Sequence, residues 1–132
     1  MKKVFTNHDH MTCIFDDEGV SLYGKHKEGF YPYGCMDSIH MTLLGEMQIT
    51  FGFAIVSFVP EKEDRPVIRE LVKTAKQLKK AAPQEEAHIY VKCSKVSDDL
   101  SREEQLKEFK NLFVTGTISK GYYDLKKRLL KD

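Results

Sequence analysis

One helical stripe constrains the fold of this chain more than any other feature of its sequence. Apolar residues recur at the spacing of one helix face at Val67, Ile68, Leu71, Val72, Ala75, Leu78 and Ala82. Exposing such a stripe to water is unfavourable, so the helix must pack against another apolar surface. The preceding stretch, Met47 to Phe58, is uncharged and rich in β-branched and aromatic residues, which is typical of a strand. We therefore expect strands that form a sheet and a helix that covers it.

A β-hairpin is predicted near the N-terminus. Met11–Phe15 and Val20–Tyr23 are two short runs of strand-forming residues, and Asp16–Gly19 separates them. An acidic loop that ends in glycine is typical of a tight turn between antiparallel strands, because glycine takes the positive φ that such turns need.

Further strands are expected between this hairpin and the helix. Residues 25–29 are polar and predict a loop, whereas residues 30–33 are aromatic and extended. Residues 37–44 alternate apolar with polar side chains, as a half-buried strand does. Gly52 lies inside the stretch Met47–Phe58 and indicates a bulge, a bend or a break into two strands. The total is roughly five to seven antiparallel strands.

The covering helix is predicted to begin near Asp64, which can cap it. Pro66 fits the first turn, because the amide at that position has no helical partner. After the helix, residues 87–96 alternate apolar and polar side chains but have polar sequence on both sides. They fit a strand and a partly extended linker equally well, and both interpretations stay open.

Residues 101–131 predict a pair of short helices. Ser101, with Glu104 three positions later, is a capping box. Gly116 fits the left-handed position after a helix, and Ser119 can cap the second helix. Neither helix is long enough to be stable alone, so the hairpin must pack on this domain or on another chain.

The hairpin resembles the bacterial short C-terminal domain called SHOCT. That pattern is a leucine-periodic helix, a glycine with an aliphatic residue and Thr or Ser, and a second helix with an aromatic residue, a lysine and terminal leucines. The matching residues are Leu106, Phe109, Leu112, Gly116, Ile118, Ser119, Tyr123, Lys127 and Leu130. Tyr122 departs from the pattern, because the family usually has an acidic residue there. The resemblance implies oligomerisation or attachment, not chemistry.

The first part of the chain resembles a bacterial pleckstrin-homology-like domain, in which antiparallel strands precede one amphipathic helix. The opening hairpin and the helix after Phe58 carry this resemblance. The expected fold class is α+β, with a small antiparallel sheet or barrel closed by one helix and followed by a helical hairpin. We expect a β domain with its closing helix at 1–82, a linker or extra strand at 83–100 and the hairpin at 101–132.

Composition and charge exclude few function classes. The chain has 132 residues with 21 basic and 20 acidic side chains, so no overall field favours nucleic acid or membrane. Its three cysteines form no CxxC pair, which fits a reducing compartment. The N-terminus lacks an apolar run of the signal-peptide type, and the uncharged run from Met47 to Pro60 is too short and too polar to span a bilayer. We expect a cytoplasmic protein.

Few polar clusters in the sequence suggest chemistry. His8 and His10 could ligate a metal if a cysteine or third histidine joined them, but no second pair at ligand spacing accompanies them, so we expect a polar loop. Asp16–Glu18 is expected to be a solvated turn. The sequence contains no phosphate-binding loop and no nucleophile elbow. We therefore expect no enzyme activity, no metal and no cofactor.

The helical hairpin carries the predicted interaction surface. An exposed face of large apolar residues is unfavourable in a monomer, which favours self-association. Tyr122 and Tyr123 are adjacent in a helix, so they point to different sides of it. We expect a non-enzymatic scaffold whose hairpin self-associates or docks and whose β domain binds a protein partner. The predicted interface residues are Phe109, Phe113, Tyr122, Tyr123, Leu129 and Leu130.

An alternative function is a binder of an anionic lipid surface or of nucleic acid. It would use the basic helix at 65–80 and the basic C-terminus at 126–131. The sheet already needs the apolar stripe of that helix, and lysines are the usual solvated side of such a helix, which favours the scaffold. The predicted basic surface consists of Arg69, Lys73, Lys76, Lys80 and Lys127.

Overall fold

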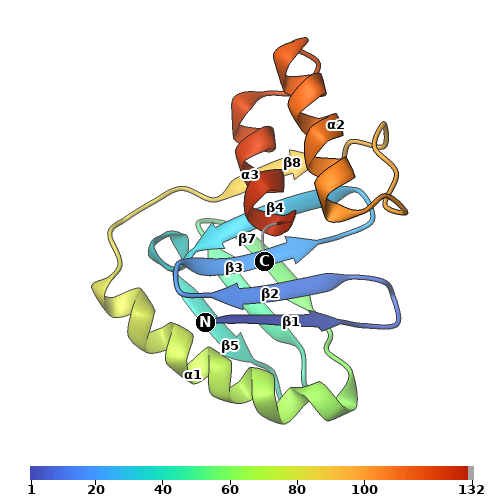
Figure 1. The fold of residues 1–132 in the computed structure, drawn as a ribbon. Coiled ribbons are helices and arrows are strands. Elements are labelled where there is room, and N and C mark those ends of the chain that lie inside the picture. The colour runs from blue at the N-terminus through green and yellow to red at the C-terminus, as the bar shows by residue number, and fades with distance from the viewer. Residues whose placement is uncertain (131–132) are drawn as a thin grey trace. The chain divides into compact units, whose positions relative to one another are not determined.

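The computed structural model describes residues 1–130, and the chain divides into two compact units, Met1–Ile89 and the segment from Tyr90 onward (Figure 1). The described residues form two antiparallel sheets, the long helix α1 and a C-terminal pair of helices. The predicted α+β class is confirmed. Eight strands are present in this part of the chain, which is more than the five to seven that we expected.

The first sheet has the strand order β1-β2-β3-β4-β8. The predicted hairpin is confirmed as β2 and β3, whose register places Cys13 opposite Leu22. Within the stretch 87–96, whose interpretation was open, β8 is a strand, and the division between the two units falls inside it. The strands are β1 (Lys2–Thr6), β2 (Thr12–Asp16), β3 (Gly19–Tyr23), β4 (Lys27–Pro32) and β8 (His88–Val91).

The second sheet has the order β5-β6-β7, with strands β5 (Ser38–Met41), β6 (Met47–Phe51) and β7 (Ala54–Phe58). The stretch Met47–Phe58 is therefore not one strand but a hairpin, and of the three predicted outcomes at Gly52 the break is correct. Gly52 has φ +59°, and Phe51 pairs with Ala54 across the turn. A side chain at this φ would be strained, so glycine allows the chain to reverse here.

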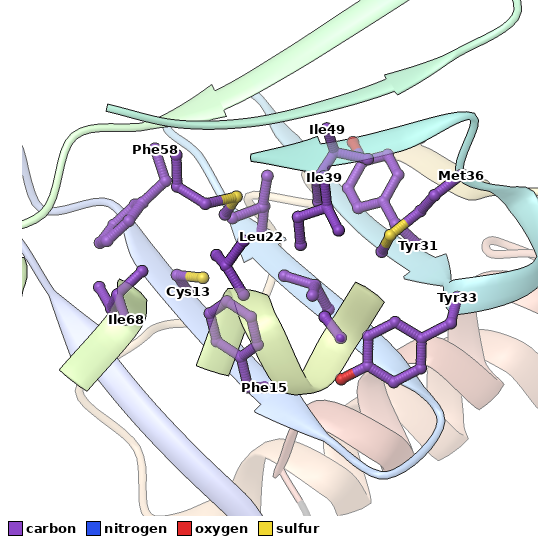
Figure 2. Close-up of a cluster of buried hydrophobic side chains, with 14 of the residues drawn as sticks. Cys13, Phe15, Leu22, Tyr31, Tyr33, Met36, Ile39, Ile49, Phe58 and Ile68 are labelled. Carbon is purple, nitrogen blue, oxygen red and sulfur yellow. The ribbon is translucent and has the colours of Figure 1, made fainter. Parts of the chain in front are cut away.

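Helix α1 (Arg65–Ala81) packs its apolar stripe into a core shared with both sheets (Figure 2). Ile68, Val72 and Ala75 are its buried residues. They join side chains of the first sheet such as Cys13 and of the second such as Ile49. The expectation that this helix covers the strands is confirmed.

Two local predictions are wrong, and one strand was not predicted. Strand β1 was not predicted, because Phe5 is the only buried side chain in its five residues and gives little apolar signal. Residues 27–29 belong to β4, since Glu28 and Gly29 pair with Tyr23 and Leu22 of β3 and are buried despite their polar or small side chains. Asp64 accepts no capping hydrogen bond with its side chain, because a short 3-10 turn, Lys62–Asp64, already leads into α1.

The second unit contains α2 (Arg102–Val114) and α3 (Lys120–Leu130), which contact each other. The predicted caps are confirmed: Ser101 Oγ accepts from the N–H of Glu104 at 3.2 Å, and Ser119 Oγ accepts from the N–H of Tyr122 at 3.2 Å. Gly116 has φ +78°, as predicted for the residue that ends the first helix.

The turn between β1 and β2 is held by one buried asparagine. Asn7 Nδ2 donates to the carbonyl of Val59 at 2.9 Å. Asn7 Oδ1 accepts from the N–H groups of Asp9 and Met11, both at 3.0 Å. Asn7 thereby ties this turn to the segment that connects β7 with α1.

We predict that Asn7→Ala lowers the free energy of unfolding by about 1–3 kcal/mol, because it removes three partly buried hydrogen bonds that hold this turn. Urea denaturation followed by circular dichroism measures this change. The matched control is Asn111→Ala, at an exposed helical position, which should change stability by less than about 0.5 kcal/mol. Equal losses in both variants would contradict the assigned role.

Candidate interaction surfaces

The second unit has its own aromatic core. Val96, Phe109 and Tyr122 are its buried members. The ring of Tyr122 lies 5.5 Å from that of Tyr90, edge to face, and 6.1 Å from that of Phe109. The hydroxyl of Tyr122 accepts a hydrogen bond from the N–H of Cys93 at 2.9 Å. Tyr122 therefore joins both helices to the segment that precedes them.

A second aromatic pair lies at the surface of the same hairpin. Phe113 of α2 and Tyr123 of α3 stack with ring centroids 5.1 Å apart and planes 14° apart, and both side chains are only partly buried. Lys127 Nζ lies 5.2 Å from the ring centroid of Tyr123, within cation–π range. Val114, next to Phe113 in the chain, is 72% exposed. We call Phe113, Val114, Tyr123 and Lys127 the aromatic patch.

The six predicted interface residues divide into two groups. Phe109, Tyr122 and Leu129 are buried within the chain and form no exposed face. Phe113, Tyr123 and Leu130 are partly exposed. The adjacent tyrosines do point to different sides of α3, since Tyr122 is buried and Tyr123 stacks on Phe113.

The five residues of the predicted basic surface, Arg69, Lys73, Lys76, Lys80 and Lys127, are all exposed. Lys73 pairs with Glu70 at 3.1 Å. In the basic C-terminus, Lys126 is instead buried, with Nζ 5.0 Å from the ring centroid of Phe109. Lys131 lies outside the described residues.

The polar clusters serve turns. His8 and His10 are exposed on the turn that Asn7 organises, and Asp16 Oδ1 accepts from the N–H groups of Glu18 and Gly19 at 2.8 and 3.0 Å. Within residues 1–130, no three His, Cys, Asp or Glu side chains lie close enough together to hold a metal ion.

Two surface leucines were not predicted from the sequence. Leu43 and Leu44 were expected at the end of a strand, but β5 ends at Met41 and both lie in the loop before β6. They are among the most exposed large apolar side chains in the described part of the chain. Gly45, which follows them, could have indicated that the strand ends earlier, because a glycine after two leucines can mark a turn.

The three cysteines lie in different surroundings. Cys13 is fully buried, and burial raises the pKa of its thiol far above the usual range. Burial, reinforced by the carboxylates of Glu85 and Asp37, raises the pKa of Cys35 to about 11. Cys93 is half-buried and lines an open hollow of about 290 Å³.

No family model, curated protein or solved structure matches this chain. The layout that both resemblances imply is nevertheless present, with antiparallel sheets, a helix packed on them and a C-terminal helical pair. None of the helices within residues 1–130 is both long and apolar enough to cross a membrane.

We predict that Tyr122→Phe lowers the free energy of unfolding by about 1–3 kcal/mol, because the N–H of Cys93 loses its partner. The matched control is Tyr123→Phe, which keeps the stacked ring and should stay within about 0.5 kcal/mol of the wild type. Chemical denaturation of both variants measures the difference. A larger loss for Tyr123→Phe would refute this description of the hairpin core.

The raised pKa of Cys35 predicts how its alkylation depends on pH. Only the thiolate reacts, so the rate with iodoacetamide should rise about tenfold per pH unit from about pH 7 to about pH 9, with no plateau. The folded protein should show no reaction at Cys13. Mass spectrometry of time points separates the three sites, and a plateau for Cys35 near pH 8.5 would exclude the raised pKa.

Proposed function

We propose that this protein is a non-enzymatic scaffold that self-associates or docks through its C-terminal hairpin and binds a protein partner with its β domain. The observation that carries the proposal is the aromatic patch, in which a stacked Phe–Tyr pair lies only partly buried. Burying aromatic rings of this size against a second surface is favourable, and Tyr and Phe are enriched at such interfaces.

The partly exposed residues of the predicted interface support an association through one side of the hairpin. Phe113 and Tyr123 are already fixed against each other, so little side-chain entropy remains to be lost on binding. Lys127 beside them provides a charge at the rim. The SHOCT resemblance of residues 101–132, which implies oligomerisation or attachment, supports the same conclusion.

Strand β7 supports the second half of the proposal. It is the last strand in the order β5-β6-β7. Phe53, in the turn just before it, and Ile55 within it are 111% and 64% exposed. A sheet edge with exposed apolar side chains can pair with an extended segment of another protein. This arrangement also agrees with the pleckstrin-homology-like layout that we propose for the β domain.

Light scattering after size exclusion, over a range of concentrations, tests the self-association. We expect the full chain to form oligomers that persist at high salt, since apolar contacts are not screened. Replacing both rings in Phe113→Ser/Tyr123→Ser should raise the dissociation constant at least about tenfold.

The matched control removes a different exposed ring. Phe53→Ser changes a fully exposed aromatic residue of the β domain and should leave the oligomer intact. Far-UV circular dichroism establishes that each variant is folded. A wild-type monomer at all concentrations, or an unchanged oligomer in the folded double variant, would refute self-association through the aromatic patch.

A further inference from the structure

A protruding loop places two leucines in water. Leu43 and Leu44 are 106% and 87% exposed between β5 and β6. Their loop is nonetheless ordered by hydrogen bonds. The N–H of Thr42 donates to the carbonyl of Glu46 at 2.8 Å, the N–H of Gly45 to the carbonyl of Thr42 at 3.0 Å, and the N–H of Glu46 to Thr42 Oγ1 at 3.1 Å. We call residues 42–46 the leucine loop.

The leucine loop is braced by the first residue of α1. The side chain of Arg65 lies over Gly45, where an added Cβ would come within 2.7 Å of Arg65 Nε. Gly45 has φ +85°, a second reason why this position requires glycine. Helix α1 packs against β5, the strand that leads into the loop (Figure 1).

Arg65 is also the first of five cations along one flank of α1. At 100° per residue, positions 65, 69, 73, 76 and 80 fall within an arc of about 80°, and all five are arginine or lysine. Four of them are exposed and Arg65 is half-buried. We call Arg65, Arg69, Lys73, Lys76 and Lys80 the basic stripe. The leucine loop lies at one end of it.

We propose that the leucine loop and the basic stripe together dock on an anionic lipid surface. The two leucines enter the boundary between headgroups and acyl chains, and the cations lie over the lipid phosphates and carboxylates. Exposed apolar side chains next to basic residues favour binding at such an interface. Each cation near an anionic leaflet and each methylene group buried in the lipid make the free energy of binding more favourable.

The leucines decide between lipid and the other polyanions. A nucleic acid would bind the basic stripe through its phosphates. Its bases stack on aromatic rings, and they make no comparable contact with aliphatic side chains such as those of Leu43 and Leu44. A bilayer uses both features at once. This surface belongs to the first unit and does not depend on self-association through the aromatic patch.

Sedimentation of the full chain with lipid vesicles tests the proposal. We expect binding to phosphatidylcholine vesicles that contain phosphatidylserine, weak binding to pure phosphatidylcholine vesicles, and loss of binding at high salt. Leu43→Ser/Leu44→Ser should weaken binding at least about tenfold. Lys73→Glu/Lys76→Glu should weaken it by a similar factor.

Matched variants control for exposure and for net charge. Val91→Ser removes another exposed apolar residue, and Lys107→Glu/Lys110→Glu reverses two exposed lysines of α2. Both should bind as the wild type does. Absence of vesicle binding at low salt overturns the proposal. The proposal is also overturned if Lys73→Glu/Lys76→Glu weakens vesicle binding while Leu43→Ser/Leu44→Ser leaves it unchanged. The surface would then bind polyanions such as a single-stranded oligonucleotide.

Discussion

The first unit depends on the burial of one face of α1. Two small sheets each present an apolar inner face, and neither sheet can hide that face with its own residues. Ile68, Val72 and Ala75 supply the apolar surface that both sheets share. Because Ile68, Val72 and Ala75 are buried there, most cations of α1 lie along its flank, where they are exposed. Val67, which the predicted stripe also included, is 47% exposed. The packing of this helix therefore also determines which of its side chains can meet a partner.

Periodicity made the main elements predictable from the sequence. The stripe of α1 and the caps of α2 and α3 depend on spacing and on short-range hydrogen bonds, which are local properties of the chain. Strand β1 and the first residues of β4 could not be predicted in the same way. These residues are strands because they pair with neighbouring strands, as Gly29 does with Leu22. Their own side chains show no alternation that would indicate this pairing.

The candidate surfaces were harder to predict, because exposure is a property of the fold. The sequence identified the hairpin residues by type, but it could not distinguish the buried ones from the exposed ones. Only the packing shows that Tyr122 is buried and that its neighbour Tyr123 is partly exposed. Lys126 was grouped with the basic C-terminus, yet it is buried over aromatic rings. Leu43 and Leu44 looked like the end of a strand because their alternation continues past Met41. The hydrogen bonds of Thr42 end the strand earlier.

The sheet orders bear on how the chain is synthesised. Apart from β8, every strand pairs with its neighbour in sequence, so each meander needs only short loops to close. Both meanders can form as soon as they leave the ribosome. The inner faces of the two sheets are covered only after residues 65–81 have been synthesised and have folded into α1. Until then, the nascent chain exposes two apolar sheet faces. The demand on chaperones should therefore be greatest just before α1 emerges.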